Sequence, residues 1–406
     1  MSSIAPFLHP FAPPARPRDR FLTIVLGDGA TVTDDTGRTY IDAMASLWYA
    51  SVGYGRVEIA DAIAAQARRI AGFHTFTSFT NEPAEALAAR VAALSPFAEP
   101  RVFFCQSGSE AVDTAMKLTR IAHGRAGRSG RTIIVARGRG YHGVNYGGTS
   151  ISGLPVNRDG FGPFVGSTMT VDPDDPAKLA AVFDAFPGEV AAVVVEPVQG
   201  ASGVWPPPPG YLEAVRVLCD EHGAYLVFDE VITGFGRLGR WFGAQHFGVQ
   251  PDMITFAKAV TSGYVPLGGV IVGPAIRSAL EADDEFVLRH GYTYSGHPLA
   301  AAAGLANLDI MEREHLLDRV PAIETRLGGG LRRFADEGRI AGVRGVGGMW
   351  AIAMVDGVDE GTVAVKMLDR GVIARPVPGT VTFCPPLVID DDQIDAVLDA
   401  VDGALP

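Results

Sequence analysis

The sequence contains little cysteine and nothing that marks a metal site. Only 3 of its 406 residues are Cys, and Cys105, Cys219 and Cys384 lie far apart, each inside or beside an apolar segment. No Cys-x-x-Cys pair and no Cys/His metal spacing occurs. We therefore expect buried free thiols in a reducing compartment, and no metal.

Segments that would direct the chain to a membrane or to nucleic acid are also lacking. No run reaches the roughly 18 apolar residues of a membrane helix, and the proline-rich start has neither the basic residues nor the apolar core of a signal peptide. The net charge is −12, without a long basic run, which argues against nucleic acid and anionic membranes as main partners. These features predict a cytoplasmic protein.

What the sequence does have is ample apolar material, 47% of its residues, in a chain longer than one compact core. From about residue 101 to 275, short apolar runs alternate with amphipathic segments, which predicts an α/β unit with a mainly parallel sheet and crossover helices. The expected strands are 101–106, 132–137, 190–197, 224–230, 252–257 and 268–273, and the clearest helices are 109–122 and 210–222.

After about residue 300 the pattern changes to an alanine-rich helix, a strand region at 342–355 and helix-strand-helix material, which predicts a smaller α+β domain. The three glycines at 328–330 interrupt a helical pattern and predict a turn or kink. We expect three parts: residues 1–55, which contribute to the small domain and the active-site entrance; residues 56–300, the large domain; and residues 301–406, the small domain.

Lys258 stands between an apolar strand-like run and a loop rich in glycine and proline. Lysine is rarely buried unless it is paired or chemically used, although a stem that covers apolar surface is an alternative. Ser107, Gly108 and Ser109 lie between a strand and a helix. There, free amides and the helix dipole favour an anion, or serine simply caps the helix.

Residues 138–143, GRGYHG, match the dinucleotide motif G-x-G-x-x-G after a strand. The following residues are too rich in glycine and serine to form the helix that this motif opens, so the nicotinamide interpretation lacks its context. Tyr141 or His142 could instead stack on a planar ligand, or both are ordinary loop aromatics.

Asp229 and Glu230 end another apolar run, where a carboxylate is costly unless it meets a cation or a donor. Asp229 could hold a protonated ring nitrogen, or pair with an arginine such as Arg237. An anion pocket, a stacking aromatic, a buried carboxylate and an apolar-flanked lysine are the four features that pyridoxal 5′-phosphate requires.

Several motifs in this order resemble the class III pyridoxal-phosphate aminotransferases of fold type I, and within them the omega-amino acid or amine:pyruvate aminotransferases. The motifs are DAMASLWYASVGYG, SGSEAVDTAMK, GRGYHG, VVVEPVQG, VFDEVITGFGRLG, TFAKAVTSGYVPLGG, TYSGHP and FCPPLVI. The resemblance implies a large domain with a mainly parallel seven-stranded sheet sandwiched by helices, and a smaller α+β domain.

The resemblance also implies a role for each matched residue. Lys258 would be the Schiff-base lysine, Asp229 the partner of the pyridine nitrogen, and Tyr141 and Ile232 the residues on the two ring faces. Ser107, Gly108 and Ser109 would cradle the phosphate, with Thr293 of the partner subunit, and His142 and Glu196 would complete the cofactor site. The substrate would be bound by Trp48, Tyr141 and Arg375. Glu196 is also the expected counter-ion of Arg375 when no carboxylate is bound, unless it is a strand-end residue bonded to backbone.

The activity implied is ping-pong transamination, in which an amine or omega-amino acid gives its amino group to pyruvate or a similar 2-oxo acid. An aminomutase or a decarboxylating transaminase of the same class is an alternative. More distant ones are a nicotinamide-dependent oxidoreductase and a non-catalytic binder of pyridoxal phosphate. The role of Thr293 implies an obligate homodimer, with a tetramer as the larger alternative.

Overall fold

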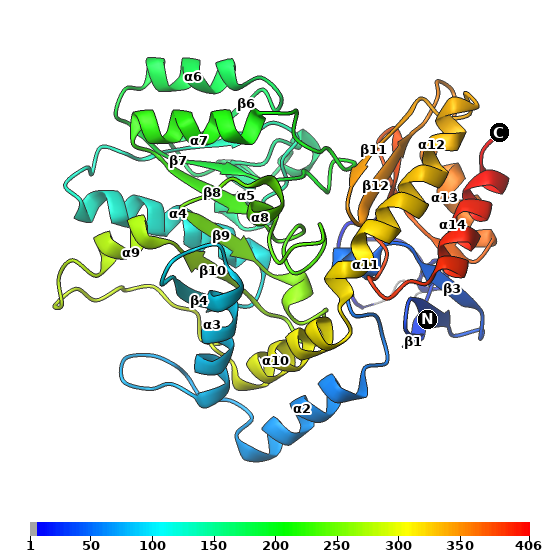
Figure 1. Ribbon diagram of the computed structural model, residues 1–406, viewed down its shortest axis with the longest axis horizontal. Helices are drawn as coiled ribbons and strands as arrows, with labels where there is room; N and C mark the ends of the chain where they lie inside the picture. Colours follow the sequence, from blue (N-terminus) through cyan, green and yellow to red (C-terminus); the bar gives the residue numbers. More distant parts are fainter. Residues whose placement is uncertain (1–5) are drawn as a thin grey trace.

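The computed structural model describes residues 6–406, and its centre is a seven-stranded sheet in the order β4-β10-β9-β8-β7-β5-β6 (Figure 1). Only β10 runs antiparallel to its neighbours. The six expected strands are confirmed; β6 was missed because it is a short, threonine-containing edge strand. The strands are β4 (Arg101–Cys105), β5 (Ile133–Arg137), β6 (Thr168–Val171), β7 (Val190–Val195), β8 (Tyr225–Asp229), β9 (Met253–Phe256) and β10 (Gly268–Val272).

Helices cover both faces of this sheet, because successive side chains of a strand point to opposite sides. In β8, Leu226 and Phe228 join one core cluster, whereas Tyr225 and Val227 join another. The first cluster contains residues of α3 (Glu82–Leu94), α6 (Pro176–Ala185) and α7 (Tyr211–His222); the second contains residues of α4 (Gly108–Arg125) and α9 (Pro274–Leu280). The predicted sandwich is therefore confirmed.

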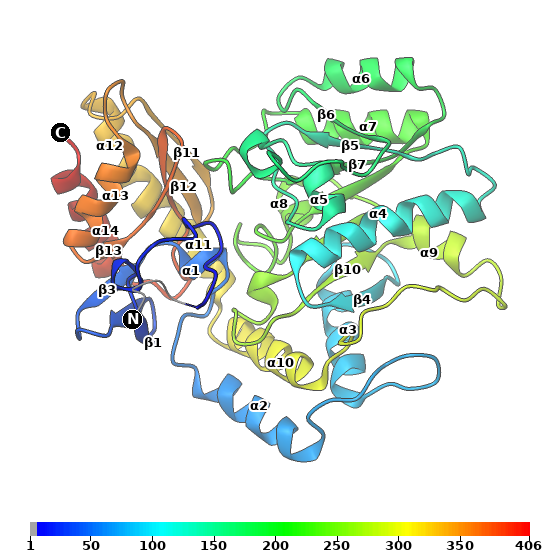
Figure 2. The same ribbon diagram turned by 180° about the vertical axis from the view of Figure 1, so that it is seen from behind.

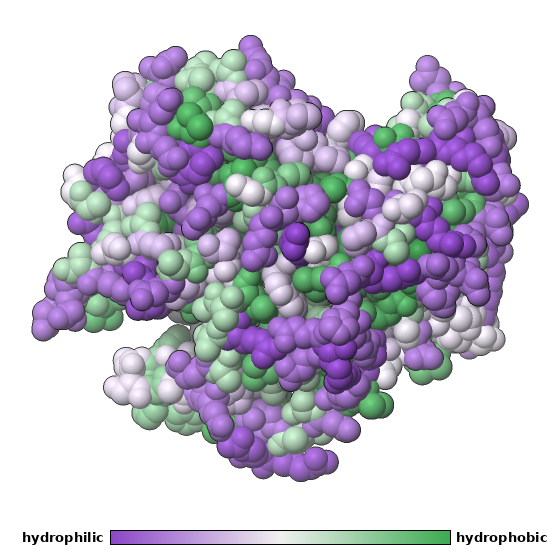
Figure 3. All heavy atoms as spheres, viewed as in Figure 1, coloured by the Kyte–Doolittle hydropathy of each residue, from purple (hydrophilic) through white to green (hydrophobic). Residues whose placement is uncertain are grey.

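Two four-stranded sheets lie beside the large sheet, on the other side of a notch that the space-filling view also shows (Figure 3). One sheet joins the two ends of the chain, since β13 (Val372–Ile373) pairs in parallel with β3 (Thr39–Asp42) next to β2 (Thr31–Asp34) and β1 (Ile24–Asp28). The other contains β11 (Gly342–Val346), β12 (Met349–Ala353), β15 (Thr380–Phe383) and β14 (Arg375–Val377). Two further helices pack here, α13 (Glu360–Asp369) and α14 (Asp391–Ala404). The boundaries at residues 55 and 300 stay a prediction.

The expected turn at residues 328–330 is wrong. The chain continues from α11 (Leu316–Ile323) through one π-helical turn (Glu324–Gly328) into α12 (Gly329–Asp336), with helical dihedral angles at Gly328 and Gly329. A Cβ atom at Gly328 would collide with the ring of Trp350, and one at Gly330 with Leu398. These glycines allow close packing against the small domain, which overrides their low helix propensity.

Six strands of the large sheet, all except β10, end at the same edge, since β4 lies antiparallel to β10, which lies antiparallel to β9. The chemically distinctive segments of the sequence follow these carboxyl ends, where ligand sites of open α/β sheets form. Ser107 follows β4, Tyr141 follows β5, Glu196 follows β7, Asp229 ends β8 and Lys258 follows β9. The topology therefore gathers residues that are up to about 150 positions apart.

The three cysteines are free and buried, as expected. Across the described part of the chain, none of the helices combines the length and the apolarity that crossing a lipid bilayer requires.

Candidate active site

A cavity at this sheet edge is lined by most of the expected site residues. Its lining also includes three residues that the sequence reasoning did not single out, Leu47, Gly143 and Val231. The full lining is Leu47, Gly108, Ser109, Tyr141, His142, Gly143, Glu196, Asp229, Val231, Ile232 and Lys258. The mixture of one amine, two carboxylates, aromatic rings and aliphatic side chains suits a planar, charged ligand.

Lys258 lies at the floor of the cavity, directly after β9. Its backbone has φ +48, a left-handed conformation that a non-glycine residue adopts only where the surrounding structure enforces it. Burial lowers the pKa of the Lys258 amine to about 8, although the charges of Asp229 and Glu196 oppose this shift. The uncharged amine, the form that acts as a nucleophile or a base, is therefore far more populated near neutral pH than in an ordinary lysine.

Asp229, at the end of β8, is held by three hydrogen-bond donors. Its carboxylate lies 2.8 Å from Nδ1 of His142 and accepts from the Thr255 hydroxyl at 3.0 Å and from the Val231 amide at 3.3 Å. Burial opposes the charged form of His142, but the hydrogen bond and the charge of Asp229 prevail and raise the pKa of the imidazole. His142 is thus a charge partner of Asp229 rather than a stacking ring.

The N-terminus of α4 lies at the cavity, where the sequence predicts an anion pocket. The Ser107 side chain caps the helix by accepting from the Glu110 amide at 3.2 Å, as the capping alternative proposed. The amides of Gly108 and Ser109 open the helix and cannot bond within it. Gly143, with φ +95, packs so closely on Ser109 that a Cβ would lie 2.5 Å from the Oγ of that side chain, so only glycine lets the GRGYHG loop fold over the cavity.

Tyr141 and Glu196 are joined through the backbone. The Glu196 carboxylate accepts from the Tyr141 amide at 2.8 Å and from the Gly200 amide at 3.0 Å, and burial raises its pKa. Within residues 6–406, no ion pair joins Glu196 to Arg375. The expectation of such a pair is not met, because both carboxylate oxygens are engaged; the backbone-bonded alternative describes Glu196.

Arg375 begins β14 in the small domain and is half-buried. Arg375 is not among the residues that line the cavity. It pairs with Thr382 of β15, whose hydroxyl lies 3.7 Å from the sulfur of Met44, a member of the core cluster that contains Ile232 of the cavity. Burial raises the pKa of Tyr141 and lowers that of Lys258; the charge of Arg375 opposes the first shift and adds to the second. Burial lowers the pKa of Arg375 itself, opposed by Tyr141. The small domain therefore contributes a cation whose charge acts on groups of the cavity, although Arg375 does not line it.

Trp48 does not reach the cavity, contrary to expectation. It is 1% exposed and belongs to a core cluster with Met44, Val198 and Ile232. Leu47 lines the cavity instead. The segment from residue 45 to 48 contains several left-handed residues, so no regular periodicity could predict which side chain points inward.

Thr293 is exposed and lies outside the cavity of its own chain. Arg237, the alternative partner of Asp229, instead donates to the Pro385 carbonyl at 2.6 Å. Glu230, next to Asp229, caps the short helix α8 (Gly243–Phe247), accepting from the Ala244 amide at 2.9 Å.

The residues present fit pyridoxal 5′-phosphate on three observations. The α4 amides offer an anion pocket, a carboxylate and an amine face the same cavity, and Nε2 of His142 is buried without a hydrogen-bond partner in residues 6–406. The loop after β5 leads only into the short helix α5 (Tyr146–Ser150), so the context of a dinucleotide motif is missing. The fold and the site define a pyridoxal-phosphate-dependent transferase of fold type I.

Comparison with known proteins gives the particular family. The family described as aminotransferase class-III matches residues 14–405. An omega-aminotransferase of Caulobacter vibrioides is 36% identical, with 97% of this chain and 96% of the relative covered. A beta-alanine–pyruvate aminotransferase of Pseudomonas aeruginosa is also 36% identical, with 94% and 91% covered.

Among solved structures, an amine transaminase from an uncultivated Pseudomonas species in its PLP-bound form superposes with a TM-score of 0.95. It is 34% identical, and the match covers 100% of this chain and 99% of that one. The chain belongs to the class III aminotransferases and is a pyridoxal-phosphate-dependent transaminase.

Proposed function

We propose that the protein transfers an amino group from an amine or omega-amino acid to pyruvate or a similar 2-oxo acid. The observation that carries this proposal is the cavity in which Lys258 and Asp229 lie beside aliphatic residues such as Leu47 and Ile232. Arg375 follows next in the small domain, paired with Thr382, whose hydroxyl contacts Met44 of the core cluster that contains Ile232. One guanidinium matches one carboxylate, and the aliphatic wall suits an uncharged substituent. The buried free thiols suit a reducing, cytoplasmic compartment.

In this proposal each residue has one task toward the cofactor, which supplies an electron sink when bound. Asp229, supported by His142 and Thr255, holds the ring nitrogen. Tyr141 and Ile232 enclose the ring. The amides of Gly108 and Ser109 bind the phosphate, and Thr293 reaches it from the partner subunit.

Lys258 anchors the cofactor and then moves the proton at the substrate carbon. Its pKa of about 8 lies much nearer physiological pH than the ordinary value of 10.5, so a larger share of the amine is unprotonated while it stays basic enough to accept a proton. The left-handed backbone after β9 holds the amine at the sheet edge, facing Asp229 across the cavity.

Arg375→Ala is expected to raise the KM for pyruvate at least about tenfold, because it removes a charge-assisted, bidentate contact. The half-reaction with a carboxylate-free amine should change by no more than a few-fold. Single-turnover measurements with each substrate, over a panel of amine donors with pyruvate as acceptor, test both statements.

Arg375→Lys is the matched control, since it keeps the charge and loses the planar fork. It should fall between the wild type and Arg375→Ala for pyruvate. Equal damage to both half-reactions, or to neither, would reject Arg375 as the carboxylate site. Product formation without an external 2-oxo acid would favour an aminomutase.

We further propose a homodimer whose interface contains the loop between α2 (Val57–Arg69) and α3. Phe73, Phe76 and Phe79 of this loop are 47%, 44% and 50% exposed, and hydrophobic residues are visible where the loop protrudes (Figure 3). Exposed aromatic groups of this kind mark interaction sites.

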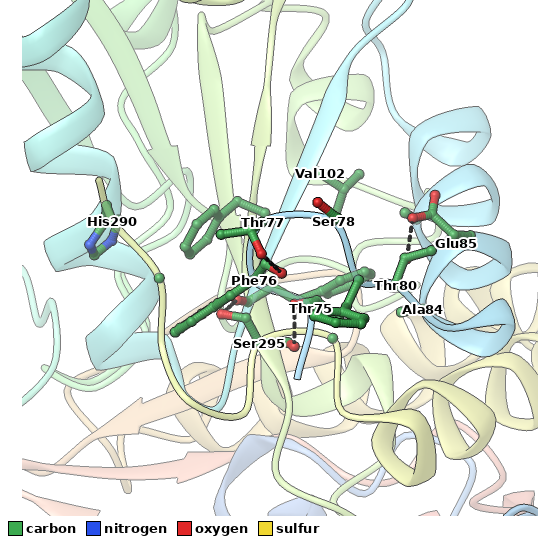
Figure 4. Close-up of a pocket in the computed structure, with 16 residues that line it drawn as sticks. Thr75, Phe76, Thr77, Ser78, Thr80, Ala84, Glu85, Val102, His290 and Ser295 are labelled. Atoms are coloured by element: carbon green, nitrogen blue, oxygen red, sulfur yellow. Dashed lines mark hydrogen bonds between the residues drawn. The ribbon is translucent and has the colours of Figure 1, made fainter. Parts of the chain in front are cut away.

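The same loop contacts the segment that contains Thr293. Thr75 donates to the Ser295 carbonyl at 2.9 Å, and Phe76 lies against Gly291 (Figure 4). Tyr294 is 61% exposed beside them. Because Thr293 does not reach the cavity of its own chain, an interface on this surface would supply it to a second copy.

Phe76→Ser is expected to weaken this dimer and to lower cofactor retention in parallel. Sedimentation of the wild type should show at least a dimer, and the variant should dissociate at concentrations where the wild type does not. Val365→Ser, which removes an exposed apolar residue of α13 in the small domain, is the control and should leave the dimer unchanged. A stable, fully active wild-type monomer would contradict the proposal.

A further inference from the structure

Trp205 lies where the large domain meets the small one. It belongs to the loop between β7 and α7, and both ribbon views show this loop reaching from the large sheet toward β11 and β12 (Figures 1 and 2). Its indole is half-buried, and its Nε1 donates to the Ser202 carbonyl at 3.0 Å. The ring is therefore held in a fixed orientation at the boundary between the two parts.

On the large-domain side, Trp205 contacts the loop that carries Tyr141. The guanidinium carbon of Arg139 lies 4.4 Å from the centre of the indole ring. Gln199 pairs with Trp205 through both backbone amides, at 2.8 and 3.1 Å, and its side chain donates to the Gly138 carbonyl at 2.7 Å. Tyr141 follows Arg139 by two residues, and its amide is held separately by the Glu196 carboxylate at 2.8 Å, so this loop has an anchor that does not involve Trp205.

On the small-domain side, Trp205 contacts Arg344 of β11. The guanidinium carbon lies 3.8 Å from the ring centre. The same guanidinium donates through Nε to the Gly203 carbonyl at 2.8 Å and through Nη2 to the Thr380 hydroxyl at 2.8 Å. Arg344 therefore ties the Trp205 loop to strand β15.

Strand β15 leads directly to the proposed carboxylate site. Thr380 pairs with Val377 of β14, the three-residue strand that begins with Arg375. Gly203, with φ +113, lets this contact form, since a Cβ there would lie 2.9 Å from Nη2 of Arg344 and 3.3 Å from Val377. The segment of Tyr141 is thus linked to Arg375 through Arg139, Trp205, Arg344 and Thr380 in turn.

The charges at this junction explain why an aromatic ring is needed. Arg344 is half-buried and has no carboxylate within 4.0 Å in residues 6–406; burial, and then the charge of Arg139, lower its pKa to about 10. Arg139 forms an ion pair with Asp174 at 2.6 Å. The partners of Arg344 are instead the Gly203 carbonyl, the Thr380 hydroxyl and the indole of Trp205. A ring face stabilises a poorly hydrated guanidinium, so losing the indole would leave two cations to repel each other across the domain boundary.

We propose that Trp205 is a positioning residue that fixes Arg375 relative to Tyr141, by holding Arg139 of one domain and Arg344 of the other against a single indole. Trp205 acts on substrate only through these neighbours. Its specific effect falls on the substrate that carries a carboxylate, and in this respect the inference rests on the proposed function of Arg375.

Trp205→Leu is expected to raise the KM for pyruvate at least about fivefold. The kcat at saturating pyruvate and the half-reaction with a carboxylate-free amine should stay within about twofold. In the holoenzyme, hydrogen exchange of the backbone amides at residues 375–383 should become faster, which reports the loosened strand independently of turnover. Trp205→Phe keeps a ring face and should restore the wild-type KM to within about twofold.

Two further variants control the experiment. Phe164→Leu removes an aromatic ring that Arg158 overlies at 4.9 Å within the large domain, and it should change neither the KM nor the exchange. Thr380→Val removes the hydroxyl to which Arg344 donates a hydrogen bond. It should also raise the KM for pyruvate, so it tests the inference even if Trp205→Leu does not fold.

An unchanged KM in the folded Trp205→Leu and Thr380→Val variants would overturn the inference, as would equal damage to the amine half-reaction. If Arg375→Ala also leaves the KM for pyruvate unchanged, it is the proposed function that fails. If Arg375→Ala alone raises the KM, only the role of Trp205 is wrong.

Discussion

Replacing Lys258 with alanine is expected to lower transamination at least about 10⁴-fold, because one change removes both the amine that anchors the cofactor and the base that moves the proton. The fold should survive, since the Lys258 side chain lies in a cavity and supports no strand. Borohydride reduction of the wild-type holoenzyme, followed by peptide mapping, should find the cofactor attached to the peptide that contains residue 258.

The alanine variant should yield no labelled peptide while still retaining cofactor at the α4 amides and Asp229. Lys117→Ala, which changes an exposed lysine on α4, should be labelled and active like the wild type. A reduced adduct on any other lysine of the wild type would overturn the assignment of Lys258.

Removal of this amine should also stabilise the cofactor-free protein at neutral pH. Burial lowers the pKa of Lys258 to about 8 from the ordinary 10.5, so the unfolded chain binds a proton that the folded chain releases between these two values. The stability of the wild type should therefore rise as the pH increases from about 8 to 10.5, and the cost of the buried charge is fully present below about pH 8.

Lys258→Met, which keeps the apolar stem, should accordingly unfold at a higher temperature than the wild type at pH 7. This difference should shrink as the pH rises through the window. If the difference in unfolding temperature between Lys258→Met and the wild type stays constant from about pH 8 to 10.5, the charged form of the Lys258 amine is not destabilised in the folded protein.

Asp229→Asn is expected to lower turnover about 10³-fold with the cofactor still bound, since a neutral amide cannot balance a protonated ring nitrogen. The change also removes the charge that raises the pKa of His142, so the imidazole should lose its proton at lower pH. Turnover per bound cofactor, its absorbance spectrum and the titration of His142 by NMR measure these effects.

Glu230→Gln is the matched control, because Glu230 is the next residue and equally buried but caps α8 outside the cavity. Burial raises the pKa of Glu230 to about 7, although the hydrogen bonds from the Ala244 and Gly243 amides oppose this shift. The control should retain most of the turnover per bound cofactor. Near-wild-type rates in Asp229→Asn would mean that another group holds the ring nitrogen.

Much of the large domain could be predicted because its patterns are local. Each buried strand is a short apolar run, and each run ends in a residue with a distinct chemical capacity, such as Asp229 or Lys258. In an α/β sheet the carboxyl ends of parallel strands meet. Residues that directly follow parallel strands are therefore expected to lie close together, and short motifs, each of fewer than about twenty residues, are enough to predict which residues line the cavity.

The interpretation of individual side chains failed where no regular element sets their direction. Trp48 and Leu47 are adjacent in a segment with left-handed residues, and only the packed structure shows which one lines the cavity. Glycines at 328–330 weaken a helix in isolation, but packing on Trp350 and Leu398 keeps the chain helical.

The sequence by itself determined the class of fold and the family, and it predicted the reactive residues, since these depend on apolar periodicity and on residue types within short motifs. Only the tertiary structure decided which groups are partners: His142 with Asp229, Glu196 with two backbone amides, and Arg344 with Trp205. Hydrogen bonds and cation–π contacts require approach within about 3 to 6 Å. Whether residues far apart in the chain approach so closely depends on how the two domains pack, which no local pattern encodes.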